Sequence, residues 1–382
     1  MPQNAYITDL SSFLPNAPVT NDQIETVLGK IKDIPSLTKE RMLANNKIEK
    51  RYYAIDPSTG NFTHTNAQLT AEAVKRLMPH DGFSLDEVQA LCCGTTSPDL
   101  IMPGHAMMVL GELGIKPCEA VSTAGICLAG MSALKYAYMS VASGASTNAV
   151  STGSELSSSF MRANFFTPAV DPNADIQNQP ILAFNADFLR WMLSDGSGAA
   201  FVSNTPNADG ISLKIEWIDS LSFAGELPTC MYAGGKQNED GSIFGWREAS
   251  SSVDAAKQNL LAVKQDTKLL GSQIVKTMGR TLGQVAKKRG ITPADIDWYL
   301  PHYSSHYFRA KFYDAMKEIG FEIPYDKWFT NLPYTGNTGS ASIYIIMEEL
   351  FKSGRLIPGE KILCFIPESG RFSHCFMLLT VV

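Results

Sequence analysis

Residues 125–155 read "GICLAGMSALKYAYMSVASGASTNAVSTGSE", and the order of features in this stretch decides the predicted fold. Small residues precede an amphipathic helix, "SG" ends the helix, and an apolar strand follows. Residues 336–370, "GNTGSASIYIIMEELFKSGRLIPGEKILCFIPESG", have the same plan. Cys127 lies 16 residues before the serine of the first "SG" and Asn337 lies 16 before the serine of the second, so the units are offset by 210 positions.

The segment that precedes each unit is repeated as well. Residues 70–99, "TAEAVKRLMPHDGFSLDEVQALCCGTTSPD", place a helix, a turn and an apolar strand before small polar residues. Residues 282–306, "LGQVAKKRGITPADIDWYLPHYSSH", have the same order. Aligning the two puts Gly94 opposite His302, an offset of 208 positions.

Because the two offsets nearly agree, we predict two pseudo-equivalent α/β halves, at 1–205 and 206–382. Their strands are apolar on both faces and alternate with amphipathic helices, which indicates mainly parallel sheets covered on both faces. In open α/β sheets, chemistry gathers at the carboxyl ends of strands and at adjoining helix N-termini. Cys127, His302 and Asn337 fall at such places, so packing of the halves about a pseudo-twofold axis would bring them into one site.

The composition predicts a soluble globular protein. The 382 residues fit one large domain or two ordinary ones, and 45% hydrophobic against 18% charged residues supply a substantial core. The net charge of −6 and the lack of a long Lys/Arg run argue against nucleic acid as a partner. No apolar run reaches the roughly 18 residues needed to span a membrane, and the N-terminal segment lacks a signal-peptide layout. We therefore expect a cytoplasmic protein without membrane attachment.

The cysteine pattern argues against a disulfide framework and against a metal site. The number of cysteines is odd and the chain is long, whereas disulfide frameworks are typical of short secreted chains. A zinc site would usually show a C-x-x-C pair or a tight Cys/His cluster, and the sequence has neither. Most of the thiols are expected to be small core residues. The seven cysteines are Cys92, Cys93, Cys118, Cys127, Cys230, Cys364 and Cys375.

Cys127 differs from the other cysteines because it stands where a helix begins. The free N–H groups there lower the pKa of a thiol and can bind an oxyanion on an attached acyl group. Taken singly, Cys127 also fits a packed core thiol, His302 a structural histidine and Asn337 an N-cap. Together they describe a site in which a thiolate takes an acyl group while neutral His302 and Asn337 donate hydrogen bonds to the enolate of a second thioester.

Several segments resemble the motifs of one enzyme family. "NNKIEKRYYA" is similar to an early "GI-x-x-R" element, "CCGTTSPDLIMPGHAMMVLGELG" to a "TTPD…P" segment, and "AGICLAG" to the nucleophile turn. "LSDGSGAAFVS" is similar to a "GDGAGA" strand entry, and "LPHYSSH" and "GNTGSAS" to the His and Asn motifs. Through nearly its whole length the chain resembles the β-ketoacyl-acyl-carrier-protein synthase III-like condensing enzymes of the thiolase superfamily.

The resemblance implies a five-layer αβαβα thiolase-like fold and a homodimer, in which "SPDLIMPGHAMM" helps to shape the partner's acyl pocket. It implies that Cys127 accepts an acyl group, and that His302 and Asn337 assist decarboxylation of a malonyl-type extender and stabilise the carbanion. A Claisen condensation then forms the carbon–carbon bond. Substrates would arrive on coenzyme A or acyl carrier protein through a phosphopantetheine arm, so no metal and no permanently bound cofactor are implied.

Two departures from the family pattern bear on the substrate. The usual Gly-rich turn reads "PESGRFSHC", in which Gly370 keeps the role of an oxyanion-hole N–H donor beside the N–H of Cys127. The segment 156–194 is rich in Phe and Met and longer than housekeeping enzymes need, so it forms either a different pocket roof or a dimer surface. Both features resemble specialised members such as the condensing enzymes of dialkylresorcinol biosynthesis, in which the second substrate is a β-ketoacyl thioester and His302 acts as a base.

A third departure follows His302, where "YSSHYFR" replaces "QAN-x-R". This departure leaves His306 unexplained. Two interpretations remain open for Arg309 and Lys311: they contact the phosphates of a carrier, or they are solvated helix residues. Acyl carriers are acidic, so their docking needs a basic patch on this protein. The alternative interpretation of the basic residues near His302 is that they form the charged end of a helix, where cations favour the helix dipole. The candidate residues for that patch are Lys287, Lys288, Arg289, Arg309, Lys311 and Lys317.

Three alternatives to such a synthase remain at this point. The first is a specialised enzyme that joins two long acyl chains without decarboxylation. The second is a catalytically silent partner of an active homologue, although such partners commonly lack the nucleophile that Cys127 would supply. The third is a cysteine hydrolase, which would need water instead of a carbanion at the acyl-cysteine.

Overall fold

A computed structural model describes residues 3–166 and 188–382 of the chain. Its main sheet has nine strands in the order β13-β14-β15-β8-β1-β7-β6-β4-β5. The first half of the chain supplies β1 (Tyr6–Phe13), β4 (Ala90–Thr95), β5 (Glu119–Ala124), β6 (Asn148–Glu155) and β7 (Gly196–Ser203). The second half supplies β8 (Leu213–Ser222), β13 (Trp298–Pro301), β14 (Lys361–Glu368) and β15 (Ser373–Val381). The two sets join where the start of β1 pairs with the start of β8.

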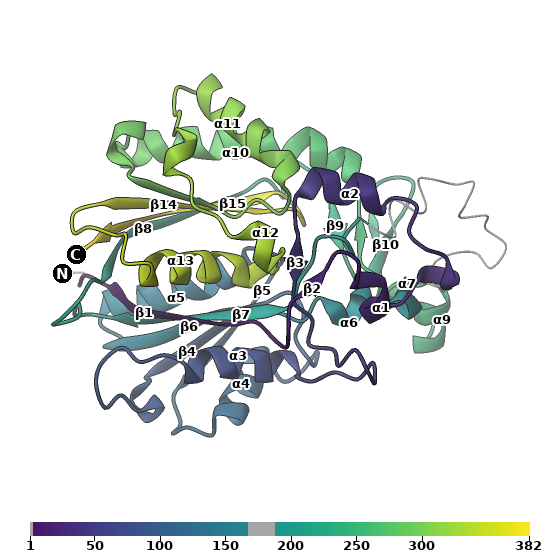
Figure 1. The fold of residues 1–382 in the computed structure, drawn as a ribbon, viewed down its shortest axis with the longest axis horizontal. Coiled ribbons are helices and arrows are strands. Elements are labelled where there is room, and N and C mark those ends of the chain that lie inside the picture. The colour runs from purple at the N-terminus through teal and green to yellow at the C-terminus, as the bar shows by residue number, and fades with distance from the viewer. Residues whose placement is uncertain (1–2, 167–187) are drawn as a thin grey trace.

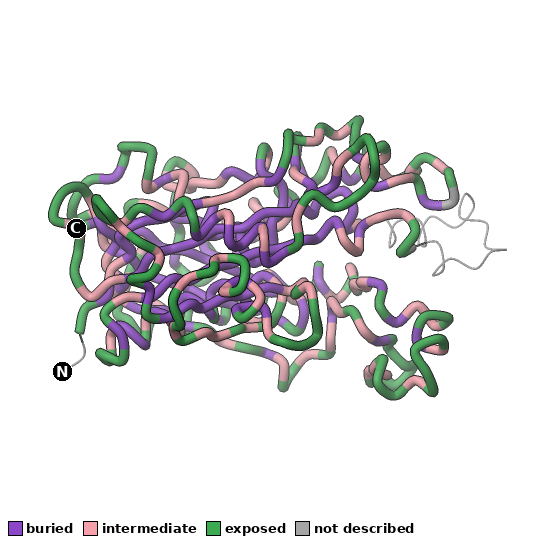
Figure 2. The backbone as a smooth tube through the Cα atoms, turned by 90° about the horizontal axis from the view of Figure 1, so that it is seen from below, coloured by how far each residue is buried: buried purple, intermediate pink, exposed green. Residues whose placement is uncertain are grey.

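Helices cover both faces of each set of strands (Figure 1). The outer layers are α3 (Asn66–Lys75) with α4 (His105–Leu113) on the first set, and α10 (Thr267–Arg289) with α11 (Arg309–Glu318) on the second. Between the two sets lie α5 (Ala129–Ser143) and α13 (Ser342–Lys352). Buried backbone is concentrated in the middle of the molecule and exposed segments surround it (Figure 2). The predicted αβαβα five-layer fold is therefore confirmed.

Shorter elements connect these layers and surround one end of the sheet. The helices among them are α1 (Ile24–Leu28), α2 (Lys39–Asn46), α6 (Ser158–Met161), α7 (Ala163–Phe166), α9 (Ser252–Lys257) and α12 (Leu332–Thr335). The short strands are β2 (Val19–Thr20), β3 (Lys50–Arg51), β9 (Met231–Tyr232), β10 (Gly235–Gln237), β11 (Ile243–Gly245) and β12 (Lys264–Gln265).

The two halves repeat each other down to single turns. A 3-10 turn at Leu85–Glu87, preceded by a capping box, leads into β4, and a second such turn at Pro293–Asp295, 208 positions later, leads into β13. β5 pairs in parallel with β4, and its counterpart beside β13 is reduced to one parallel bridge between Tyr299 and Trp328. The pseudo-equivalent halves are therefore confirmed, whereas a domain boundary at 205/206 stays a prediction.

The expectation of mainly parallel sheets was wrong. Parallel pairing is limited to β4 with β5, β4 with β6, and β13 with β14, while β1, β7, β8 and β15 run antiparallel to their neighbours. The strands are apolar on both faces because helical layers cover both faces, and this burial does not depend on strand direction. The short turn between β14 and β15 requires that pair to be antiparallel.

Glycines at the seam let the two halves approach closely. A Cβ atom at Gly130, in the first turn of α5, would lie 2.5 Å from the Ser340 carbonyl oxygen, and one at Gly153 in β6 would overlap the same oxygen. The small residues of "GICLAG" and "STGSE" therefore allow the turn before α13 to rest on α5 and β6. This contact places Cys127 and Asn337 at the same seam.

Candidate active site

Cys127, His302 and Asn337 line one cavity. They come from the turn before α5, the end of β13 and the turn before α13. Their residues are 7%, 3% and 4% exposed. The structure thus brings together the three predicted residues at the seam between the halves, and it leaves their catalytic roles as a prediction.

Cys127 lies two residues before the first residue of α5. Burial raises the pKa of its thiol well above the ordinary value, and the carboxylates of Glu155 and Glu368 raise this pKa further. The backbone at Cys127 lowers this pKa, but loss of hydration penalises the charged thiolate more strongly, so the pKa rises overall. The structure corrects the expectation of a resting thiolate: the free protein holds a neutral thiol, whose proton must leave as the sulfur is acylated.

His302 presents an unpaired nitrogen in this cavity. Its backbone N–H donates to the carbonyl oxygen of Phe365 at 2.8 Å, which ties the end of β13 to β14. Its Nε2 atom is buried and has no hydrogen-bond partner in the part of the chain that the structure describes. Burial lowers the pKa of His302 to about 4, so the imidazole is neutral at pH 7. A neutral imidazole with a free Nε2 is available to a substrate group.

Asn337 is held by hydrogen bonds on both sides of its backbone. Its N–H donates to the Met192 carbonyl oxygen (3.0 Å), and its carbonyl oxygen accepts from the Ser194 N–H (2.9 Å). Its side-chain Oδ1 accepts from the Gly339 N–H at 3.0 Å. Because Oδ1 is engaged in the turn, Nδ2 is the end of the amide that can donate to a ligand. Asn337 therefore shapes the turn before α13 and lines the cavity, but it is not an N-cap, because Ala341 holds that position in α13 and Thr338 holds it in the preceding 3-10 turn.

Glu155 is a cavity residue that the sequence analysis missed. It is 2% exposed, and its carboxylate accepts from the hydroxyl groups of Thr96 (2.7 Å) and Ser97 (3.1 Å) and from the Ser340 N–H (3.3 Å). Burial raises its pKa to about 7, against the hydrogen bonds from Thr96 and Ser340 that lower it. The sequence signal was a lone acid at the end of the otherwise uncharged strand "NAVSTGSE". Glu155 thus connects a loop of the first half to the Asn337 turn.

The described ends of the 156–194 segment form part of the cavity wall. Phe160 comes from α6, and four residues come from the stretch that leads into β7. Residues 167–187, the remainder of the predicted insert, lie outside the described residues. The described part therefore supports the pocket-wall interpretation of this segment. The four residues are Phe188, Leu189, Met192 and Leu193.

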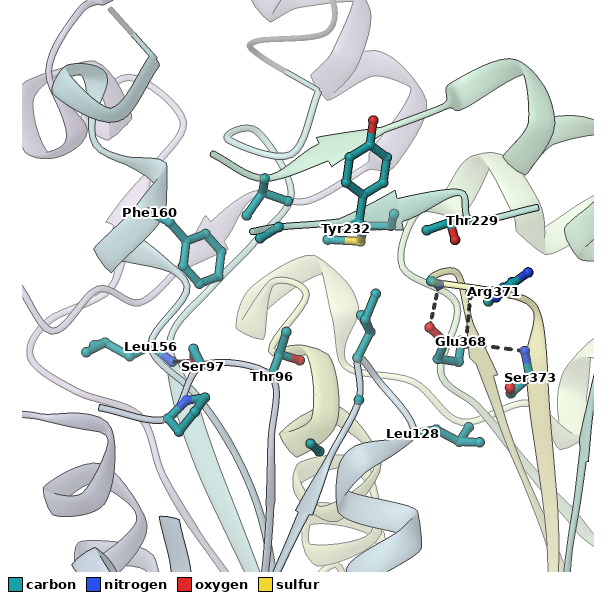
Figure 3. A pocket seen from close by; sticks show the side chains of 18 of the residues that line it. Thr96, Ser97, Leu128, Leu156, Phe160, Thr229, Tyr232, Glu368, Arg371 and Ser373 are labelled. Carbon is teal, nitrogen blue, oxygen red and sulfur yellow. Dashed lines mark hydrogen bonds between the residues drawn. The ribbon is translucent and has the colours of Figure 1, made fainter. Parts of the chain in front are cut away.

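A second and larger cavity of about 840 Å³ adjoins the first (Figure 3). Both cavities are lined by Thr96, Ile126, Phe160 and Met231, so they share a wall. The remaining lining of the large cavity includes Tyr232 from β9, Thr229 and Ser373. The large cavity is therefore separated from the Cys127 cavity only by this shared wall.

Gly370 lies at the large cavity, in the turn between β14 and β15. Its backbone N–H, the predicted oxyanion-hole donor, donates to the carboxylate of Glu368. A substrate oxygen would have to displace this carboxylate to use the same N–H. The oxyanion role of Gly370 and of the Cys127 N–H stays a prediction, and for Gly370 the structure adds this condition.

The predicted carrier-binding cations already have contacts within the protein. The guanidinium of Arg309 stacks 3.7 Å from the centroid of the Tyr325 ring, and Lys311 Nζ donates to the Tyr307 hydroxyl at 2.8 Å. Lys288 and Arg289 both bind Asp219, Lys317 lies over the Tyr313 ring, and His306 meets the edge of Tyr303. Among these contacts, only the Asp219 carboxylate offsets positive charge, on Lys288 and Arg289, and carrier binding by the predicted patch stays a prediction.

Within residues 3–166 and 188–382, no group of three or more His, Cys, Asp or Glu side chains is placed to hold a metal ion. The helices in the same ranges include none that combines the length and the apolar character of a membrane span.

Comparisons with known proteins agree with the fold and with the motifs. The profile of the "3-Oxoacyl-[acyl-carrier-protein (ACP)] synthase III C terminal" family matches residues 286–369. The "Beta-ketoacyl-[acyl-carrier-protein] synthase III 2" of Deinococcus radiodurans is 26% identical over 358 residues, which cover 94% of this chain and 89% of that protein.

Solved structures of low sequence identity share the fold. The tetronic acid condensing enzyme AbyA1 superposes with a TM-score of 0.76 at 20% identity, over 98% of this chain and 99% of that one. A variant of OleA from Xanthomonas campestris superposes with a TM-score of 0.77 at 18% identity, over 99% and 98%. The Aquifex aeolicus 3-oxoacyl-[acyl-carrier-protein] synthase III superposes with a TM-score of 0.67 at 20% identity, over 98% and 99%.

The five layers and the superposition on these solved structures show a thiolase-like fold. In sequence, the chain is similar to 3-oxoacyl-[acyl-carrier-protein] synthase III proteins, over residues 286–369 for the family profile and over 94% of the chain for the Deinococcus radiodurans protein.

Proposed function

We propose that this protein is an acyltransferase that loads an acyl group onto Cys127 and forms a carbon–carbon bond by Claisen condensation with a second thioester. The observation that carries this proposal is the convergence of Cys127, His302 and Asn337 on one buried cavity at the seam of an αβαβα fold. A catalytically silent subunit would have no need to keep a thiol, an unpaired imidazole nitrogen and an amide in one place.

The role of each of the three residues follows from its protonation and from the atoms it has free for hydrogen bonding. The neutral Cys127 thiol attacks the carbonyl carbon of the incoming thioester, the acyl–sulfur bond to the carrier breaks, and the carrier leaves as a thiol that takes the proton from Cys127. His302 Nε2 and Asn337 Nδ2 donate hydrogen bonds to the oxygen of the second thioester as it becomes an enolate. These donors act in a site shielded from water, where a hydrogen bond to a developing charge is strong.

A third cavity offers a route for the carrier arm. It measures about 220 Å³ and lies between α2, the start of α10 and Tyr307, with Arg41 and Lys268 in its wall. It shares Phe188, Met192, Leu270 and Phe308 with the Cys127 cavity. A phosphopantetheine arm of coenzyme A or of an acyl carrier protein would reach Cys127 by this route, with no permanently bound cofactor.

The large cavity favours a specialised member that joins two acyl chains. Its volume of about 840 Å³ and the Phe-rich wall of the Cys127 cavity provide room beyond that needed for a short starter. AbyA1 is named as a tetronic acid condensing enzyme, and an OleA variant was solved with bound lauric acid and lauroyl-CoA. We further infer that the protein is a cytoplasmic homodimer. Within each chain, the two halves divide near residue 205.

Intact-mass measurement after incubation with acyl thioesters, from acetyl to long and β-keto chains, tests the proposal. The native protein should gain the mass of one acyl group, and Cys127→Ala should gain none. His302→Ala should still become acylated but should lose condensation by about 100-fold or more, because it lacks a donor to the enolate. No mass gain with any donor, or an equal gain on Cys127→Ala, would refute the proposal.

A further inference from the structure

The Tyr344 side chain, from the first turn of α13, crosses the seam between the two halves. It is fully buried, and it lies against three glycines of the first half, one each from α5, β6 and β7. A Cβ atom at Gly130 would lie 2.9 Å from the tyrosine ring, and one at Gly153 would lie 3.0 Å from it. A Cβ atom at Gly198 would overlap the Cβ atom of Tyr344. The first half thus leaves a slot for this side chain, because glycine stands at each of the three places.

The hydroxyl at the end of this ring has two partners in the first half. It donates to the Gly130 carbonyl oxygen at 2.8 Å, and a hydrogen bond of 2.7 Å joins it to the Ser151 hydroxyl of β6. Because a tyrosine hydroxyl has a single proton, Ser151 is then the donor of the second bond. Burial raises the pKa of Tyr344 well above its ordinary value, so the hydroxyl stays protonated and keeps donating to Gly130.

The bond to Gly130 links the two helices that follow the site residues. Gly130 is the second residue of α5, and Cys127 lies three positions before it. Tyr344 is the third residue of α13, and Asn337 lies seven positions before it. The bond therefore joins the first turn of the helix that follows the predicted nucleophile to the first turn of the helix that follows the predicted amide donor.

The counterpart of Tyr344 in the first half has no hydroxyl. At the offset of 210 positions, Tyr344 corresponds to Leu134 of α5, which is fully buried in the same apolar cluster. Leu134 packs there by apolar contact alone. Filling the core at this place does not require a hydroxyl, so the role of the Tyr344 hydroxyl lies in the two bonds that it makes.

Acylation and condensation depend on the seam in different ways. Acylation takes place on Cys127, which belongs to the first half. Condensation also needs His302 and Asn337, two residues of the second half, to lie within reach of the acyl group on Cys127. A misplacement of about 1 Å can slow a reaction by about 100-fold. A bond that fixes α13 against α5 therefore bears on condensation more than on acylation.

Building on the proposed function, we propose that Tyr344 is a positioning residue for the condensation step. By holding the Gly130 carbonyl oxygen, its hydroxyl sets the place of the Asn337 amide relative to the Cys127 sulfur. Tyr344 is not among the described residues that line the three cavities, so it acts through the two helices and touches no substrate.

Three variants separate this role from a contribution to stability. Tyr344→Phe removes both bonds and leaves the Ser151 hydroxyl buried without this partner, which lowers the Tm. Ser151→Ala removes one bond and leaves Tyr344 bonded to Gly130. In the double variant neither hydroxyl remains, so its Tm should return toward that of the native protein. The Gly130 carbonyl oxygen keeps its hydrogen bond within α5 in all three variants.

The measurement follows the two half-reactions separately. Each protein is acylated with acetyl-CoA or lauroyl-CoA, with intact mass as the readout, and the acyl-enzyme is then mixed with increasing malonyl-CoA or β-ketolauroyl-CoA. We expect native acylation rates in all variants. The saturated rate of condensation should fall by about 10-fold or more in Tyr344→Phe and in the double variant, with the half-saturating concentration unchanged. Ser151→Ala should condense at the native rate.

Other outcomes overturn the inference. Recovery of condensation together with the Tm in the double variant would show that Tyr344→Phe acts only through stability. An unchanged condensation rate in Tyr344→Phe, or an equal loss of acylation and condensation, would exclude a positioning role. An equal loss in Ser151→Ala would assign the effect to the Ser151 bond instead of the Gly130 bond. A native protein that takes up no acyl group, or that is acylated and does not condense, would refute the proposed function itself and the inference with it.

Discussion

Around Cys127, two buried carboxylates lie near a neutral thiol. Glu155 and Glu368 both raise the pKa of this thiol, so neither prepares a resting thiolate. Thr96 and Ser97, in the loop after β4, donate hydrogen bonds to Glu155, and the turn that follows β14 donates to Glu368. The two acids therefore have different surroundings, and of the two only Glu155 lines the Cys127 cavity.

Glu155→Gln tests the cost of burying the first of these acids. Burial raises the pKa of Glu155 from 4.5 to about 7, so between these pH values the folded protein keeps a proton that the unfolded chain releases. The contribution of Glu155 to the free energy of unfolding therefore falls as pH rises through this window and is constant above it. Glutamine does not titrate, so the variant lacks this loss of stability. The difference in the free energy of unfolding, variant minus native, should therefore rise by at most about 3 kcal/mol between pH 5 and pH 8.

Denaturant unfolding at the two pH values gives this difference directly. Glu239→Gln, on the exposed hairpin, should leave the difference between the two pH values unchanged. If Glu155→Gln behaves like this control, the buried carboxylate is not the source of the pH dependence.

At the scale of elements, the contact between the two central helices positions the site. α5 begins just after Cys127, and α13 begins shortly after Asn337. The turn before α13 reaches α5 and β6 because Gly130 and Gly153 have no side chains. Any added volume at these positions would push the Asn337 turn away from Cys127.

Gly153→Ala tests this close contact. The new methyl group would overlap the Ser340 carbonyl oxygen, and overpacking of this kind costs about 1–3 kcal/mol. We expect a lower Tm and slower condensation. Gly283→Ala in α10 is the control, because its site is open and alanine favours a helix, so its Tm should stay equal or rise. A Gly153→Ala protein as stable and as active as the native one would contradict the close packing of the seam.

At the scale of the whole molecule, one apolar surface lies beside the edge strand β5. Leu100 (46% exposed), Ile101 (71%), Met102 (74%) and Met107 (49%) project from the segment between β4 and β5. Exposed clusters of this kind mark interaction surfaces, and an open edge strand invites pairing with another chain. The proposed homodimer would cover both features.

Native mass spectrometry tests the dimer. The native protein should be dimeric, and a double variant with Ile101→Glu and Met107→Glu should be mainly monomeric, because two charges on each copy would be buried at the interface. Val253→Glu replaces an equally exposed apolar residue at the start of α9 and should stay dimeric. A monomeric native protein, or a double variant that remains dimeric, would rule out this surface as the interface.

The repeat along the chain was sufficient to predict the two halves and the meeting of three site residues, whereas the five layers were predicted from the family resemblance. Offsets of 208 and 210 positions are properties of sequence spacing, and they correctly placed Cys127, His302 and Asn337 at one seam. Strand direction was not predictable in the same way, because strands buried on both faces have the same apolar pattern in either direction.

The amino-acid sequence by itself thus determined the order of elements, the duplicated plan and the candidate residues, since all of these depend on spacing and periodicity along the chain. The tertiary structure decided the chemical state of those residues. Burial left the Cys127 thiol and the His302 imidazole neutral, and it placed the Glu368 carboxylate on the Gly370 N–H. A pKa and a hydrogen-bond partner depend on solvent exclusion and on residues distant in sequence, and only the folded chain supplies both.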